Sequence, residues 1–150
     1  YKRQLGGVYG TVPAPQKKRS MPYRRITPRD MWVDDPASPL YNQHFVLKHD
    51  PVTPWEFKQQ MKLNDYAHSL KLFIRHNAAD GRQKPVPGAG SSIFFHIWRR
   101  DGGAPTAGCT AMSEENLRAM IAWLDPSRHP LYILLPAREY LRLRRAWGLP

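Results

Sequence analysis

The stretch "SSIFFHIWRR" (residues 91–100) predicts a β-strand, because it is dense in β-branched and aromatic residues. Side chains alternate between the two faces of a strand, so His96 should share a face with aromatic residues and lie opposite a wholly apolar face. The first face comprises Phe94, His96 and Trp98, and the second comprises Ile93, Phe95 and Ile97. This alternation places a single titratable group, His96, in the apolar part of the strand.

The segment "DGGAPTAGCTAM" (residues 101–112) follows as a glycine-rich connection and contains Cys109, the only cysteine of the chain. Cys109 comes 13 residues after His96, which is far enough for the chain to leave the strand, turn and return beside it. A free thiol with a pKa of about 8.5 is mostly protonated at neutral pH, and a neighbouring imidazole can remove its proton. The small residues Ala107 and Gly108 would let backbone N–H groups approach a developing oxyanion. This combination suits acyl transfer through a thioester.

From the residues alone, Cys109 has two interpretations. A lone cysteine often fills a small apolar space, and a histidine beside aromatic side chains is often a buried structural residue. A Gly-Cys step on a loop near a strand histidine favours a nucleophile instead. The non-enzymatic alternative is a basic envelope or nucleic-acid binding module in which Cys109 is structural.

The flanking sequence predicts a mostly β fold with short helices, in which a mixed sheet or sandwich holds the His96 strand beside the Cys109 loop. Further strands are expected at the start of 31–41, in 70–77 and, as a buried strand, in 130–136. Helices are expected near Pro54, over 113–124 with Ser113 as N-cap, and over 137–147 before Gly148. A loop is expected over 78–90, and residues 1–30 show little periodicity.

Composition limits the possible functions. The 150 residues, 41% of them hydrophobic, are expected to form one domain over residues 1–150, and we expect a monomer. The net charge of +11 indicates an anionic partner such as nucleic acid, acidic lipid or a carboxylate-rich polymer. The sequence lacks an RNA-binding aromatic motif, zinc-finger spacing and a helix-turn-helix, so nucleic acid is not the expected partner. It also lacks an apolar run of roughly 18–20 residues and metal-ligand spacing of its histidines, so no transmembrane segment, metal or cofactor is expected.

Two segments, "GAGSSIFFHIW" (88–98) and "PTAGCTAM" (105–112), together resemble the catalytic core of the L,D-transpeptidases, the YkuD-type domain. The segments "MWVDDPASPLYN" (31–42), "NDY" (64–66) and "RHN" (75–77) resemble one branch of that family. The resemblance therefore extends from about Tyr23 to Pro136, which is most of the chain. It is carried by the combination of a Ser/Thr-x-Gly-Cys motif with an upstream strand histidine.

The resemblance implies a bacterial enzyme of the periplasm or cell envelope that acts on peptidoglycan stem peptides as donor and acceptor. It implies that Cys109 attacks the carbonyl of the third stem residue and expels the terminal D-alanine, with His96 as general base and later acid. The carbonyl of Ile97 would orient the imidazole, and backbone amides of Ala107, Gly108 and Cys109 would hold the oxyanion. An amine of a second stem would then form a cross-link of uncertain linkage type. Water in its place would give L,D-carboxypeptidase or amidase activity.

The chain departs from the common family pattern around these motifs. Ile97 replaces the glycine after the histidine, Ala107 replaces the histidine before Gly-Cys, and the arginine two residues after the cysteine is missing. Carboxylate recognition would then fall to other side chains. The candidate substrate-binding residues are Arg75, His76, Trp98, Arg99 and Thr106. The alternative is that the basic members of this set are ordinary surface charges.

Two differences in length also separate the chain from its relatives. The early "K-x-E-G-D-G-x-T-P" stretch is not found, so the chain either starts inside the domain or lacks its first strands. The segment from Phe45 to His76 is longer than the matching loop of close relatives. Trp55 and Tyr66 in this segment belong either to a lid over the cleft or to a packed surface excursion.

Overall fold

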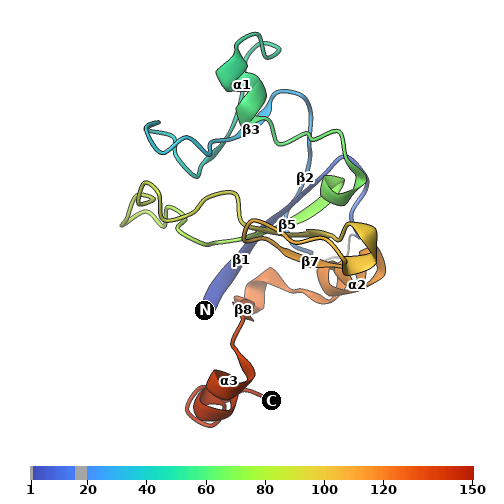
Figure 1. Ribbon diagram of the computed structural model, residues 1–150, viewed down its shortest axis with the longest axis vertical. Coiled ribbons are helices and arrows are strands. Elements are labelled where there is room, and N and C mark those ends of the chain that lie inside the picture. The colour runs from blue at the N-terminus through green and yellow to red at the C-terminus, as the bar shows by residue number, and fades with distance from the viewer. Residues whose placement is uncertain (1, 16–19) are drawn as a thin grey trace.

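The computed structural model describes residues 2–15 and 20–150. Its main sheet has the strand order β2-β1-β5-β6-β7, and β8 pairs with the first residues of β1 (Figure 1). The strands are β1 (Lys2–Gly10), β2 (Tyr23–Arg25), β5 (Leu70–Ile74), β6 (Phe94–Ile97), β7 (Thr110–Met112) and β8 (Leu131–Ile133). The β1/β2 and β6/β7 pairs are parallel and the others antiparallel, so the predicted mostly β fold with a mixed sheet is confirmed.

The nine-residue strand β1 is the element least evident in the sequence, because three of its residues are glycines and glycine is depleted in strands. At Gly6, an added Cβ would come within 2.6 Å of Cδ1 of Phe73. At Gly10, it would come within 2.7 Å of the carbonyl oxygen of Ser69. These glycines therefore allow β5 and its preceding turn to lie close against β1.

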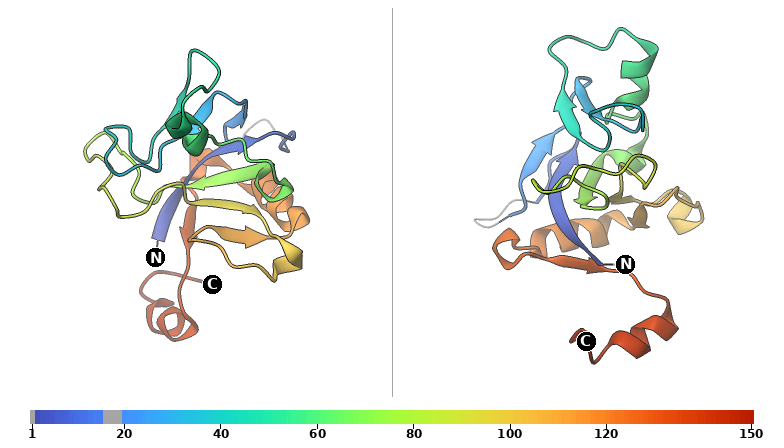
Figure 2. Two further views of the ribbon diagram at one scale, coloured as in Figure 1. Left: turned by 45° about the horizontal axis from the view of Figure 1, so that its top comes forward. Right: turned by 90° about the vertical axis from the view of Figure 1, so that its left-hand side faces the viewer.

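One face of the main sheet is covered by α2 (Glu114–Trp123), as Figure 2 shows. The helix begins where the sequence predicts, because the side chain of Ser113 accepts a hydrogen bond from the backbone N–H of Asn116 at 3.2 Å. Leu117 and Ile121 are buried against the sheet. The cluster on this face comprises Val8, Met21, Leu70, Leu72, Ile74, Phe95, Ile97, Leu117, Ile121 and Leu124.

The opposite face of the main sheet carries an aromatic cluster. The ring of Trp32 lies 4.4 Å from that of Phe73 and 4.9 Å from that of Phe94, measured between centroids. Trp32 belongs to a second, antiparallel sheet formed by β3 (Asp30–Trp32) and β4 (His44–Val46). α1 (Pro54–Gln59) adjoins β3 at one end of the molecule (Figure 1). The second sheet thus packs through its tryptophan onto the face that His96 was predicted to occupy.

The strand that carries His96 follows the predicted alternation. Phe95 and Ile97 pack in the cluster beneath α2, whereas Phe94 belongs to the aromatic cluster.

Two predictions about other segments were wrong. Residues 110–112, expected to be part of a connection, form β7 because they pair with the edge of β6. The 130–136 strand is not buried: β8 pairs only with β1, and Leu131 is 48% exposed.

The remaining helical segments are short. The 3-10 helices are η1 (Tyr66–His68), η2 (Arg100–Gly102) and η3 (Pro126–Arg128). α3 (Ala137–Leu143) ends earlier than predicted and projects from the sheet at the C-terminal end (Figure 2). In the long 45–76 segment, the indole N–H of Trp55 donates to Asp35 at 2.9 Å, and the hydroxyl of Tyr66 donates to Glu114 at 2.6 Å. Both side chains are exposed and hydrogen-bonded to neighbouring carboxylates.

Candidate active site

His96, Cys109 and a lysine, Lys71, share the face of the main sheet that carries the aromatic cluster. Lys71 on β5 lies directly opposite His96 on β6. Cys109 directly precedes β7, and the parallel register of β6 and β7 places it beside Phe94, two residues before His96. With strands about 4.8 Å apart and a rise of about 3.3 Å per residue, the Cα atoms of Cys109 and His96 are roughly 8 Å apart. An imidazole and a thiol can meet across that separation.

The imidazole of His96 has a defined orientation. Its Nδ1 lies 2.7 Å from the backbone carbonyl oxygen of Ile97. A carbonyl can only accept, so Nδ1 carries the hydrogen and the neutral ring has its acceptor at Nε2. His96 is only 2% exposed, and its ring stacks on that of His68, with centroids 4.5 Å apart. The carbonyl of Ile97 thus fixes one edge of the ring, and His68 covers one face.

The thiol of Cys109 is half-buried beside the aromatic cluster. Its Sγ accepts the backbone N–H of Phe94 at 3.4 Å and donates to the carbonyl oxygen of Ser92 at 3.5 Å. Burial raises the pKa of the thiol above its ordinary value of 9.0, although the Phe94 N–H and the charges of Lys71 and Arg99 act in the opposite direction. The thiol is therefore protonated at neutral pH.

The imidazole is neutral under the same conditions. Burial lowers the pKa of His96 below 6.5, the charges of Arg99 and Lys71 act in the same direction, and the hydrogen bond to Ile97 opposes them. The resting pair is thus a neutral thiol and a neutral imidazole, not a thiolate and an imidazolium. Such a pair performs general-base catalysis, in which the proton moves as the sulfur attacks.

The loop before Cys109 is shaped by Gly108 and Thr106. Gly108 has a φ of 131°, in the region that favours glycine, and an added Cβ would lie 3.1 Å from Cδ1 of Ile93. The hydroxyl of Thr106 donates to the carbonyl oxygen of Cys109 at 2.6 Å and accepts the N–H of Gly108 at 3.4 Å. Thr106, a candidate substrate-binding residue, thus uses its hydroxyl within the loop.

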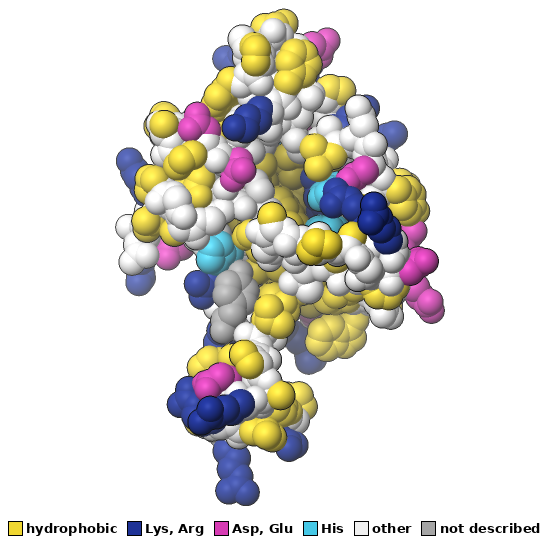
Figure 3. All heavy atoms as spheres, viewed as in Figure 1, with side chains coloured by type: hydrophobic (Ala, Val, Ile, Leu, Met, Phe, Trp, Pro, Cys, Tyr) yellow, Lys and Arg dark blue, Asp and Glu magenta, His cyan; other side chains and the backbone are white. Residues whose placement is uncertain are grey.

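Cavities adjoin Cys109 on more than one side. One of about 200 Å³ is lined by Cys109, Lys71 and His68 among others. A second, of about 330 Å³, shares Cys109, Ser92 and Asp34 with the first. Figure 3 shows the hollowed middle of this face, with histidine side chains at its margins. The thiol is therefore accessible to a ligand from a cleft larger than either cavity alone.

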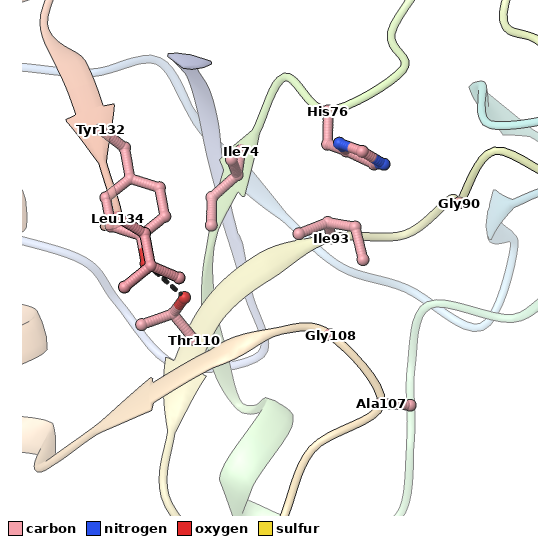
Figure 4. Close-up of a pocket in the computed structure, with 9 residues that line it drawn as sticks. All are labelled: Ile74, His76, Gly90, Ile93, Ala107, Gly108, Thr110, Tyr132 and Leu134. Atoms are coloured by element: carbon pink, nitrogen blue, oxygen red, sulfur yellow. Dashed lines mark hydrogen bonds between the residues drawn. The ribbon is translucent and has the colours of Figure 1, made fainter. Parts of the chain in front are cut away.

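A third cavity lies on the other side of the loop (Figure 4). It has a volume of about 400 Å³ and shares Ile93 and Ala107 with the second cavity. Its lining is mainly apolar, and at one end the hydroxyl groups of Thr110 and Tyr132 lie 2.9 Å apart in a hydrogen bond. The loop that holds Gly108 therefore separates the cavity lined by Lys71 and His68 from the one lined by His76 and apolar side chains.

Lys71 is the functional candidate that sequence reasoning missed. It is only 4% exposed, and its Nζ donates to the carbonyl oxygen of Met61 at 2.7 Å. Burial lowers the pKa of the ammonium group to about 8, although attraction from Cys109 and Asp65 opposes that change. The sequence did contain a sign of it, because alternation in the 70–77 strand puts Lys71 on the same face as Phe73. A lysine at a fully buried position is rare unless its charge is paired.

His68 is a second residue that sequence reasoning missed. Its Nδ1 lies 2.7 Å from a carboxylate oxygen of Asp65, and its backbone N–H also donates to that carboxylate. Arg99 pairs with the other oxygen of Asp65. Burial would raise the pKa of Asp65, but the hydrogen bonds from Arg99 and His68 lower it to about 2. Asp65 thus fixes the position of the ring that stacks on His96.

The other predicted substrate-binding residues are dispersed. His76 lines the apolar cavity, and its Nε2 lies 2.8 Å from the carbonyl oxygen of Ala89. Arg75 lines a separate cavity with Lys2 and Arg3, and its Nη2 donates to the carbonyl oxygen of Ala79. Arg99 forms an ion pair with Asp65, and Trp98 is 37% exposed. The structure thus brings Cys109, Ala107, Gly108 and His76 around one loop, keeps His96 on the neighbouring strand β6, and leaves Arg75 apart.

Within residues 2–15 and 20–150, no three side chains of His, Cys, Asp or Glu are gathered as a metal ion would need. No helix in the same ranges is long and apolar enough to cross a membrane.

Comparison with known proteins identifies the family. No significant match was found among curated proteins or among solved structures. The family model YkuD, described as the L,D-transpeptidase catalytic domain, matches residues 8–133. That range includes the His96 strand, the Cys109 loop and most of the strands of the main sheet. The chain therefore belongs to the YkuD family of L,D-transpeptidase catalytic domains.

Proposed function

We propose that this protein is a peptidoglycan L,D-transpeptidase that joins stem peptides through a thioester on Cys109. One observation carries the proposal: a protonated thiol and a neutral, oriented imidazole share one sheet face beside a cleft. Family membership supplies the reaction class and the cell-wall substrate. The proposal places the protein in the bacterial envelope, where stem peptides occur.

The acylation step begins with proton transfer from Cys109 to Nε2 of His96. Sγ attacks the carbonyl carbon of the third stem residue, and a tetrahedral oxyanion forms. The backbone N–H of Cys109 is the proposed donor to that oxyanion, because the left-handed φ at Gly108 turns the loop backbone sharply beside the sulfur. The N–H of Gly108 would join it by giving up its 3.4 Å bond to Thr106. His96 then gives its proton to the departing amine, the C–N bond breaks, and D-alanine leaves.

The deacylation step reverses these roles. An amine of a second stem attacks the thioester carbonyl, and His96 accepts the proton that the amine loses. The C–S bond breaks, the sulfur leaves as a thiolate, and His96 returns the proton to it. The products are a new amide and the original enzyme. Water in the place of the amine would yield a free tripeptide carboxylate.

Basic groups support an anionic substrate. The net charge of +11 favours association with a polymer that bears free carboxylates. Arg99 lies near both Cys109 and His96, since its charge affects the pKa of each. His76 reaches the apolar cavity on the far side of the loop. These two are the proposed contacts for substrate carboxylates among the candidate set.

The test is intact-mass spectrometry of the protein incubated with disaccharide tetrapeptide. The wild type should gain the mass of the disaccharide-tripeptidyl group and release D-alanine, whereas Cys109→Ala should gain nothing. His96→Gln should slow acylation roughly 10²- to 10⁴-fold. His49→Gln, at an exposed histidine that lines none of these cavities, should behave as the wild type. A folded wild type that forms neither adduct nor product would overturn the proposal.

The same incubation distinguishes transfer from hydrolysis. Dimers among the products indicate transpeptidation, and their sequencing identifies the linkage. Tripeptide monomers alone indicate L,D-carboxypeptidase activity through the same thioester. An unreactive thiol together with binding of an anionic polymer would favour the basic binding module.

A further inference from the structure

We propose that Lys71 is a positioning residue whose buried ammonium group stabilises the Cys109 thiolate as the thiol loses its proton. The proposal rests on the proposed function only in requiring that Cys109 ionises. Lys71 lies outside the Cys-His motif. It is on β5, which flanks β6 on the side opposite β7.

The first support is position. Lys71 and Cys109 flank β6 on the same face: Lys71 lies opposite His96 in β5, and Cys109 lies beside Phe94 at the start of β7. Both residues line the cavity of about 200 Å³. The Nζ of Lys71 lies 5.5 Å from the ring centroid of Phe94, and the backbone N–H of Phe94 donates to Sγ. The ammonium group and the sulfur are thus both in contact with Phe94.

The second support is the lack of a carboxylate partner. In the described part of the chain, no acidic oxygen lies within ion-pair distance of Lys71. Its Nζ donates to the carbonyl oxygen of Met61 instead. The carboxylate that attracts it at longer range, Asp65, is already bonded to Arg99 and His68. A buried ammonium without an anion is destabilised, which is why its pKa falls to about 8. A thiolate at Cys109 would supply the missing anion.

The third support comes from the charges around Lys71. Attraction to Cys109 and to Asp65 opposes the effect of burial on the pKa of Lys71. The residues that directly follow Cys109, Thr110 and Ala111, bring no charge to it. The other charged or titratable groups around the cavity and its network are His96, His68, Asp65, Arg99, Asp34 and Lys58. Among the lysines of residues 2–15 and 20–150, only Lys71 is buried, and its charge lowers the pKa of the thiol.

The test compares alkylation of Cys109 by neutral iodoacetamide and by anionic iodoacetate in wild type, Lys71→Met and Lys62→Met. Methionine has nearly the length of lysine and suits a buried position. Lys62 is an exposed lysine beside Met61, so its loss controls for the change in net charge. Lys71→Met should slow iodoacetamide at pH 7 roughly tenfold, as expected for a rise of one unit in thiol pKa. It should slow iodoacetate more, and Lys62→Met should change neither rate.

The wild type provides a measurement that does not depend on a variant. Its ratio of iodoacetate to iodoacetamide rates should exceed that of an unfolded cysteine peptide. The ratio should fall as the pH rises through about 8, where Lys71 loses its charge. The neighbouring histidines lose their charges at lower pH and do not produce this change.

Two outcomes would overturn the proposal. One is a Lys71→Met protein whose thiol pKa and rate ratio equal those of the wild type. The other is a wild-type ratio at pH 7 that is no higher than that of the unfolded cysteine peptide. Failure of the proposed function is a separate result, since the protein would then form no adduct with tetrapeptide whatever the effect of Lys71 on alkylation.

Discussion

The imidazole rings of His68 and His96 are stacked, with centroids 4.5 Å apart and planes inclined by 28°. His68 comes from η1, and His96 comes from β6. Because Asp65 and Arg99 hold His68 in place, the stack transmits their arrangement to the ring of His96. His68 lines the cavity while His96 is nearly inaccessible, so His68 also shields His96 from water. The general base of the proposed reaction is therefore positioned by a second histidine.

Replacement of His68 tests this relationship. We expect His68→Ala to lower kcat roughly tenfold and to raise the pKa on the acidic side of the kcat/KM profile, because His96 becomes hydrated. His68→Phe keeps a ring for stacking and should retain most of the activity. Steady-state kinetics over pH 5–8 would measure both effects. A His68→Ala protein as inactive as His96→Gln would instead identify His68, paired with Asp65, as the base.

The pH dependence of the reaction follows from the environment of His96. His96 must be neutral to accept a proton, and burial holds its pKa below 6.5. Activity should therefore rise with pH through a midpoint below 6.5 and be level just above it. The charge of Arg99 helps to lower this pKa, so Arg99→Gln should move the midpoint upward, while Arg100→Gln at the exposed neighbouring position should not. A midpoint above 6.5 in the wild type would contradict this description.

Gly108→Ala should damage the site more than the fold. The φ of 131° and the 3.1 Å approach to Ile93 would force the loop backbone to move, and displaced oxyanion donors typically cost 10²- to 10³-fold in kcat. Gly81→Ala is the matched control, because Gly81 also has a positive φ, of 83°, but has open space around it. Both variants should lose about 1 kcal/mol of unfolding free energy, measured by urea denaturation, and only Gly108→Ala should lose activity. Equal kinetics in the two variants would argue against an oxyanion role for the loop.

Asp30 of β3 is a buried carboxylate. It contacts Arg24 of β2, in the main sheet, and His44 of β4, in the second sheet. Burial would raise its pKa, but hydrogen bonds from Arg24, Thr27 and His44 outweigh burial and lower the pKa from 3.8 to about 2. A lowered carboxyl pKa stabilises the fold at pH values above about 4, and this contribution is lost as the pH falls towards 2. The shift corresponds to about 2 kcal/mol.

Asp30→Asn should therefore reduce the unfolding free energy by about 2 kcal/mol at pH 7 and by about 1 kcal/mol at pH 3, because half of the contribution is lost by that pH. Asp50→Asn provides the comparison, because Asp50 forms an exposed ion pair with Arg29. Exposed pairs contribute about 0–1 kcal/mol, so its loss should be small at either pH. Urea unfolding at the two pH values would measure the difference. A loss at Asp30→Asn that does not vary with pH would indicate packing and not charge.

Local patterns explain which parts of the fold were predictable. Alternation in the His96 strand and the capping of α2 by Ser113 depend on residues close together in sequence, and both were predicted correctly. The Gly-Cys step and the upstream histidine likewise indicated the family that the comparison identified. These features need no information about distant parts of the chain. The sequence by itself thus determined the family and singled out Cys109 and His96 as candidate reactive groups.

Long-range pairing decided the remainder. The glycines of β1 lower its local preference for a strand, yet β1 forms because β2, β5 and β8 pair with it. β7 forms for the same reason at the edge of β6. Lys71 and His68 are candidates because β5 and η1 lie beside β6 in the fold, although neither residue is near the Cys-His motif in sequence. Only the tertiary structure decides the electrostatic surroundings of the site, because those charges come from segments that are distant in sequence and meet when the sheet assembles.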